Sequence, residues 1–187
     1  YEISTRDWSS DVCSSDLVSK VYQDYLCDVY SNSFGLNIIK TRMFTYINPK
    51  RSDLFASSFA KQIAEIELGQ RDILKHGNLD SIRTILDVRD AMDAYIACAE
   101  MCEIGDVYNI GGDTVVTVGD VLQKLISYAQ KKIVTEIDQN LLRPIDVTLQ
   151  VPNDKKFRKI TGWTPRYSLD ETLLELLDFW RAKVRAS

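Results

Sequence analysis

Apolar residues begin to recur at helical spacing just after position 17. They are Val18, Val21, Tyr22, Tyr25, Leu26 and Val29. Steps of three and four residues place side chains on one face of a helix, so this spacing predicts an amphipathic helix that Gly35 ends. The following segment, 36–44, is rich in β-branched and aromatic residues and predicts a buried parallel strand, after which Pro49 breaks the chain.

Two further helices are predicted between positions 55 and 101. The first presents one apolar face, ends at Gly69, and consists of Phe55, Phe59, Ile63 and Ile66. The second starts at Asp87, whose carboxylate is a suitable cap for the first backbone N–H groups. We expect its inner face to be Val88, Met92, Tyr95, Ile96 and Ala99.

The remaining pattern alternates short strands with capped helices. Segments 106–110 and 133–137 predict strands, and a brief helix from Asn153 is closed by Gly162. Two capping boxes start longer helices, Thr117 with Asp120 and Ser168 with Glu171. Their expected core residues are Val121, Leu122, Leu125 and Ile126, then Leu173, Leu176, Leu177 and Trp180. Strands alternating with helices predict an α/β fold with a largely parallel sheet.

The first seventeen residues differ from the rest of the chain. They contain five serines, repeat Ser-Ser-Asp and have no helical or strand period. Segment 6–17 is similar to a translated synthetic sequencing adapter, so we interpret residues 1–17 as a non-native, disordered leader. The alternative is a natural Ser-rich leader.

Composition excludes several classes of protein. The chain has 187 residues, 45% of them apolar, and a net charge of −4. It is therefore a globular protein rather than a disordered or disulfide-framed one, with no basic cluster for nucleic acid and no apolar run long enough for a membrane span. No signal peptide is visible, and we read the four cysteines as free thiols of a cytoplasmic protein.

The sequence contains no complete catalytic or metal-binding motif. Neither Gly-x-Gly-x-x-Gly nor a P-loop occurs, and the pair Gly111-Gly112 is not part of a phosphate-binding loop motif. The single histidine, His76, has no second ligand near it in sequence, so we expect no metal site and interpret His76 as structural or exposed. Trp163 and Trp180 are interpreted as packing anchors.

Six segments in order resemble the extended short-chain dehydrogenase/reductases, and especially the GDP-mannose 4,6-dehydratases and GDP-4-keto-6-deoxymannose reductases. The segments are VSKVYQDYL, TRMFTYINPKR, KHGNLDSIRTILDVRDAMDAY, VYNIGG, LLRPIDV and TGWTPRYSLDETLLELLDFWR. The resemblance runs from Val18 to Arg181. It implies the C-terminal half of an extended Rossmann-type, NAD(P)-binding fold.

The resemblance assigns Lys20 to a Tyr-x-x-x-Lys motif that binds the cofactor, NADP or NAD, and takes part in catalysis. Residues four apart share a helix face, so the ammonium can lower the pKa of the tyrosine phenol. Position 16, where the tyrosine would stand, holds Asp16 within the leader. We therefore expect the tyrosine to have been cut away and the chain alone to be inactive. The alternative for Lys20 is an ordinary surface lysine.

The same resemblance assigns Arg83 and Arg143 to the diphosphate of a GDP-linked sugar, because guanidinium groups match phosphate oxygens bidentately. The alternative is a surface salt bridge, of Arg83 with Asp87 and of Arg143 with Asp146. Asn78 is a candidate for the nucleotide or sugar, or simply a turn residue.

Two more candidates depart from the family pattern or fit it loosely. Thr45 stands where many relatives have an asparagine whose amide contacts the substrate. Either the Thr45 hydroxyl replaces that amide, or the sugar that is recognised differs from theirs. Lys61 is a candidate for the base or phosphate, with an exposed helical lysine as the alternative.

The resemblance implies three divisions of the chain: the leader 1–17, the last Rossmann helix and strand 18–46, and a sugar-nucleotide-binding lobe 47–187 that returns some elements to the Rossmann sheet. It implies a GDP-mannose 4,6-dehydratase that oxidises C4 and removes water across C5 and C6. A reductase, a UDP-hexose epimerase relative and a non-catalytic binding domain remain alternatives. Pairing through the helix from Val18 to Tyr30 implies a homodimer or homotetramer, with that helix exposed and the isolated chain prone to aggregate.

Overall fold

The computed structural model describes residues 8–142 and 147–186, with side chains from Val18 onward. Its first element is the long helix α1, Trp8–Phe34. The predicted helix is confirmed, but it starts earlier than expected, and residues 8–17 are helical rather than disordered. Extending an existing helix adds one hydrogen bond for each residue fixed and needs no new nucleus, which explains why an aperiodic segment continues it.

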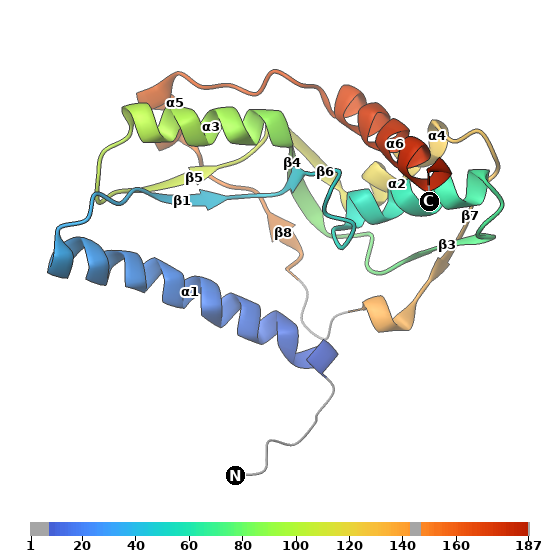
Figure 1. Cartoon of the computed structure of the whole chain (residues 1–187), viewed down its shortest axis with the longest axis horizontal. Helices are drawn as coiled ribbons and strands as arrows, with labels where there is room; N and C mark the ends of the chain where they lie inside the picture. The colour runs from blue at the N-terminus through green and yellow to red at the C-terminus, as the bar shows by residue number, and fades with distance from the viewer. Residues whose placement is uncertain (1–7, 143–146, 187) are drawn as a thin grey trace, which may run out of the picture.

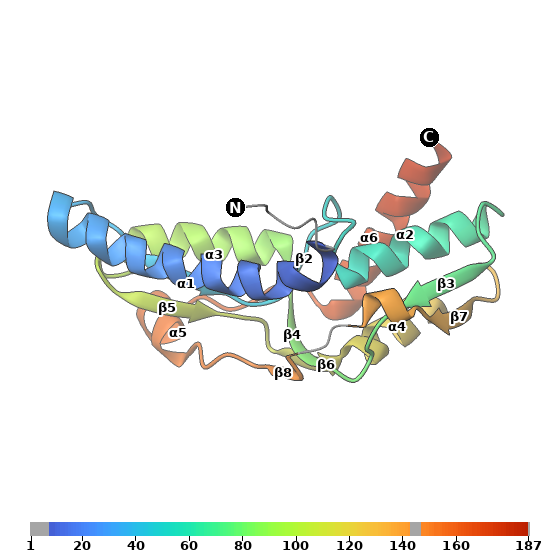
Figure 2. The same cartoon turned by 90° about the horizontal axis from the view of Figure 1, so that it is seen from below.

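One end of the molecule is built on a two-stranded parallel sheet (Figures 1 and 2). Figure 1 shows α3 and α1 on opposite sides of these strands, and α5 packs against both α3 and β5. The elements are β1 Lys40–Met43, α3 Val88–Met101, β5 Val107–Ile110 and α5 Lys155–Thr161. Phe157 and Trp163, whose ring centroids are 5.6 Å apart, anchor the core here, so the packing role of Trp163 is confirmed.

The inner face predicted for α3 is wrong. Its buried residues are Asp90, Ala91, Ala94 and Cys98. The residues expected inside are instead outside, with Met92, Tyr95, Ile96 and Ala99 exposed and Val88 half-buried. A helix that lies close to a sheet needs small side chains at the contact. The size of the side chains therefore determined which face of α3 is buried, whereas apolar character alone suggested the opposite face.

A second sheet joins the two ends of the molecule. Its strands are β2 Tyr46–Ile47, β4 Ile82–Asp87, β6 Thr114–Thr117 and β8 Leu149–Gln150. Strand β4 is central, parallel to β2 and β8 and antiparallel to β6. A Cβ on Gly112, in the segment between β5 and β6, would lie 1.9 Å from the carbonyl oxygen of Ile85, so only glycine permits this segment to approach β4 so closely.

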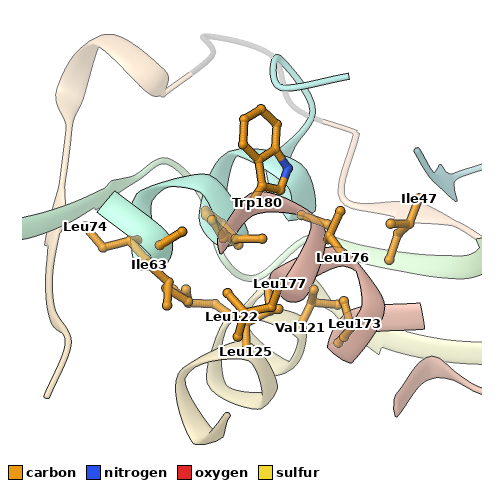
Figure 3. Packing of buried hydrophobic residues seen from close by; sticks show 14 of the residues in the cluster. Ile47, Ile63, Leu74, Val121, Leu122, Leu125, Leu173, Leu176, Leu177 and Trp180 are labelled. Carbon is orange, nitrogen blue, oxygen red and sulfur yellow. The ribbon is translucent and has the colours of Figure 1, made fainter. Parts of the chain in front are cut away.

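Three helices and a parallel strand pair form the other end (Figure 1). They are α2 Phe55–Glu67, β3 Ile73–His76, α4 Val118–Ser127, β7 Val134–Ile137 and α6 Leu169–Arg185, with a short 3₁₀ helix η1 at Gln139–Leu141. Figure 3 shows side chains of α2, α4 and α6 meeting in one core, with Trp180 3% exposed. The core faces predicted for these three helices, and both capping boxes, are confirmed.

The observed architecture confirms the predicted fold class. Four of the five strand pairings among the described residues are parallel, and helices separate most strands along the chain. The apolar face of α1 is exposed, with Val18, Tyr25 and Phe34 each about two-thirds accessible. Among the described helices, none combines the length and apolar character needed to cross a bilayer.

Candidate functional site

A cleft of about 390 Å³ opens where the second sheet meets the helical end of the molecule. Its walls are the segment from Thr45 to Asn48, the first turn of α2, the end of β3 with the following turn, and parts of β4 and β8. The ends of β2 and β3, with the residues that follow them, thus meet the start of β4 at one hollow. Carboxyl ends of strands are the usual location of ligand sites in α/β proteins.

The turn after β3 fits tightly against η1. A Cβ placed on Gly77 would lie 2.6 Å from the carbonyl oxygen of Leu141, which is closer than carbon and oxygen can approach. Gly77 and Leu141 both line the cleft. The absence of a side chain at position 77 therefore allows the turn after β3 to pack closely against η1 at this wall of the cleft.

The structure brings three of the predicted residues, Thr45, Asn78 and Arg83, to this cleft. All three side chains are half-buried. The Asn78 carboxamide accepts a hydrogen bond from the Asp80 N–H at 2.9 Å, and the Arg83 guanidinium donates to the Ile82 carbonyl at 2.9 Å. Asn78 therefore stabilises the turn and also lines the cleft, so the role of a turn residue and that of a ligand contact are compatible.

Arg143 lies outside the described residues, as does Asp146. The described residues on either side, Leu141 and Gln150, both line the cleft. The salt bridge suggested for Arg83 involved Asp87, whose carboxylate receives hydrogen bonds from Arg89 and Thr172 at 2.9 Å each.

Lys61 is not among the residues that line the cleft. It lies on α2, pairs with Glu65 at 3.7 Å, and places its ammonium 5.8 Å from the Trp180 ring centroid. The half-buried side chain of Lys61 therefore covers the edge of the core.

Lys20 lies far along the chain from this group and lines a different hollow, of about 760 Å³, between α1 and β1. Its side chain is exposed, and its ammonium donates to the Gln23 carboxamide at 3.4 Å. The side chain of Asp16, four residues earlier, lies outside the described part of the molecule.

Sequence reasoning missed several polar residues of the cleft. Ser57, in the first turn of α2, is 2% exposed and donates to the Asn48 carbonyl at 2.9 Å, while Ser81 is likewise buried. His76 is 6% exposed, so it is buried at the wall of the cleft. The available signal was the alternation in β3, where Leu74 and His76 share one face.

The charges around the cleft are partly compensated. Hydrogen bonding from Arg51 lowers the pKa of the Asp53 carboxyl to about 2, so this rim carboxylate stays ionised and paired. At the end of β4, burial raises the pKa of the Asp87 carboxyl, but hydrogen bonds from Arg89 and Thr172 lower this pKa by more. The net pKa of Asp87 therefore lies below its ordinary value. The cleft is also lined by two cations, Lys75, which pairs with Asp138 at 3.6 Å, and Arg83, together with several hydroxyl and amide groups.

This set of groups is suited to binding rather than to bond-breaking. Guanidinium, ammonium and hydroxyl donors match the oxygens of phosphate and sugar groups. In the part of the chain that the structure describes, no three histidine, cysteine or acidic side chains gather closely enough to hold a metal ion.

Comparison with known proteins finds relatives of this chain among nucleotide-sugar enzymes. Residues 16–176 match the family model described as GDP-mannose 4,6 dehydratase. GDP-6-deoxy-D-mannose reductase of Pseudomonas aeruginosa is 28% identical over 90% of this chain and 56% of its own. GDP-mannose 4,6-dehydratase of Yersinia enterocolitica is 22% identical over 90% of this chain and 54% of its own.

Solved structures give the same picture. The structure of RMD from Pseudomonas aeruginosa complexed with NADPH superposes with a TM-score of 0.80 at 26% identity, over 89% of this chain and 56% of that one. UDP-glucuronic acid 4-epimerase from Bacillus cereus, in complex with UDP-glucuronic acid and NAD, has a TM-score of 0.75 at 23% identity, over 89% and 52%, and so shares the fold.

The chain spans about half the length of the curated relatives it matches. The family match nevertheless covers most of the chain, from the middle of α1 into α6. The polypeptide therefore belongs to the GDP-mannose 4,6-dehydratase family.

Proposed function

We propose that this chain is the nucleotide-sugar-binding part of an NAD(P)-dependent enzyme that modifies a GDP-linked, mannose-type sugar. The observation that carries the proposal is the cleft, where Thr45, Asn78 and Arg83 come together although 38 residues of sequence separate the first from the last. Residues that align with a family's binding motifs and also meet in one hollow fit a ligand site better than a solvated surface.

Within the cleft, Arg83 binds the diphosphate, and Arg143 joins it from the segment between Leu141 and Gln150. A bidentate guanidinium on each side of a pyrophosphate neutralises spread charge and fixes its orientation. Asn78 contacts the nucleotide or sugar, and the Thr45 hydroxyl takes the place of the amide found in many relatives.

Lys20 is the residue of this chain assigned to the cofactor, NADP or NAD. Its exposed side chain lines an open hollow and donates to the exposed Gln23 carboxamide at 3.4 Å, a contact that the ribose hydroxyls of a bound cofactor can replace. When bound, the oxidised cofactor would accept a hydride from the sugar and return it later in the reaction. NADPH and NAD occur in the structures of relatives described above, which supports this assignment.

The proposed reaction is oxidation at C4 of the sugar, loss of water across C5 and C6, and return of the hydride at C6. Reduction of the 4-keto sugar is the second candidate, favoured by the 28% identity to the Pseudomonas reductase. This chain alone carries out neither reaction. Asp16 stands four residues before Lys20, and a carboxyl group loses its proton well below neutral pH, so it cannot exchange a proton as a tyrosine phenol does.

Thermal unfolding with added ligands tests this proposal. A ligand that binds the folded state raises its melting temperature. GDP-mannose should therefore raise the melting temperature of the chain more than UDP-glucose at equal concentration. Equal or larger stabilisation by UDP-glucose would favour a UDP-hexose enzyme, while no effect of either would favour a non-catalytic domain. Turnover of GDP-mannose by the chain would contradict its proposed inactivity.

The exposed face of α1 supports pairing with a second copy, because seven large apolar residues of this helix remain accessible. The three cysteines that the structure describes are free thiols, which agrees with a reducing cytoplasm. A homodimer or homotetramer in the cytoplasm is accordingly part of the proposal.

A further inference from the structure

The imidazole of His76 is held in one orientation at the wall of the cleft. Its Nδ1 lies 2.8 Å from the Gly77 carbonyl oxygen. A carbonyl oxygen only accepts, so Nδ1 carries the proton and donates. The neutral ring then has its lone pair on Nε2, which is an acceptor.

Nε2 has no hydrogen-bond partner within the described residues. The enclosed side-chain atoms without a partner, among those residues, are Thr84 Oγ1, Asp90 Oδ1 and Trp180 Nε1. Nε2 is not one of them, although His76 as a whole is 6% exposed. The atom is therefore open to the cleft that His76 lines, and it is an acceptor awaiting a donor.

We propose that His76 is a specificity-determining residue of the cleft, whose Nε2 accepts a hydrogen bond from an N–H or O–H group of the bound nucleotide sugar. This inference rests on the proposed function. A ligand that places an apolar group beside Nε2 leaves this acceptor unpaired, and a ligand that places a phosphate oxygen there opposes it with a second acceptor. Both kinds of ligand are disfavoured. The donor is an N–H of the base or an O–H of the sugar, and phosphate alone cannot supply it when fully ionised.

The surroundings fix this acceptor in place. The backbone of His76 pairs with β7 and accepts from the Asp138 N–H at 2.9 Å. The neighbouring Lys75 is tied to the Gln62 carboxamide through both its N–H and its carbonyl. A ring held by strand pairing and by its own Nδ1 bond loses little further freedom on binding, which makes it an effective selector.

Nitrogen NMR of the imidazole tests the inference without assignment, because His76 is the single histidine of the chain. At about pH 8.5, where an ordinary imidazole is neutral, the Nε2 resonance should shift on saturation with GDP or with mannose 1-phosphate. Inorganic pyrophosphate should leave it unchanged. A shift with GDP alone assigns the donor to the nucleoside, and a shift with mannose 1-phosphate alone assigns it to the sugar.

Affinity measurements on variants provide the second test. His76→Phe keeps the ring but removes the acceptor, and should weaken binding of the ligand that shifts Nε2 by roughly tenfold. His76→Gln restores an acceptor and should recover most of that loss, while the exposed control Lys132→Ala should bind like the unaltered chain. If GDP and mannose 1-phosphate bind while Nε2 stays unshifted, or His76→Phe binds equally well, the inference is overturned. If no probe binds, the proposed function fails as well.

Discussion

Replacing Gly77 by alanine should disturb both the stability of the chain and its ligand cleft. The added Cβ would lie 2.6 Å from the Leu141 carbonyl oxygen, whereas ordinary contact begins near 3.4 Å, so η1 must retreat by about 0.8 Å. The obstacle is backbone, which cannot rotate away as a flexible side chain can. Overpacking of this kind reduces the free energy of unfolding by about 1–3 kcal/mol.

Urea unfolding of the chain, followed by circular dichroism, measures this loss, and a titration with GDP measures the effect on the cleft. Gly119→Ala is the matched control. Its Cβ would lie 3.3 Å from the Leu79 carbonyl oxygen, inside helix α4, where alanine is favoured over glycine by about 1 kcal/mol. The control should change unfolding by less than about 1 kcal/mol and leave GDP affinity unaltered. Equal stability and GDP affinity for Gly77→Ala and the unaltered chain would refute this reasoning.

Three further predictions concern stability and assembly. Asp87→Asn should make the free energy of unfolding fall less steeply as the pH is lowered. The depressed carboxyl pKa stabilises the fold above about pH 4, and this contribution is lost as the pH drops through the lower folded pKa. Unfolding curves from pH 7 to pH 2 measure this pH dependence, and an unchanged slope would contradict the prediction. Ser168→Ala removes the capping box of α6 and should lower the free energy of unfolding by about 1 kcal/mol, whereas no loss in urea titration would show the cap to be redundant. Tyr25→Glu, on the exposed face of α1, should shift the chain toward monomer in analytical ultracentrifugation, and persistence of the dimer would place the interface elsewhere.

Periodicity and capping predicted most helices because their signals are local. The Leu and Val residues of α4 and α6 lie on one face, and each helix begins at a residue that satisfies its own first N–H groups. The orientation of α3 could not be obtained this way. Ala91, Ala94 and Cys98 are inside because β1 and β5 approach closely, and that approach is a property of the tertiary packing.

The candidate site was predictable only as far as family motifs reach. Thr45, Asn78 and Arg83 were identified by resemblance, and the cleft unites them. Ser57 and His76 carry no motif, and they meet at the cleft because α2 packs against β3, a contact that sequence spacing does not reveal. The close packing of Gly77 against Leu141, where an added Cβ would lie 2.6 Å from the carbonyl oxygen, likewise depends on segments more than sixty residues apart.

A crystal structure of the chain soaked with GDP tests the central claim most directly, since that claim is the binding of one diphosphate by Arg83 and Arg143. We expect the diphosphate in the cleft beside Thr45 and Asn78, with oxygens of the diphosphate about 2.7–2.9 Å from nitrogens of both guanidinium groups. Density for GDP outside this cleft, or a diphosphate with Arg143 directed away from it, would contradict the account.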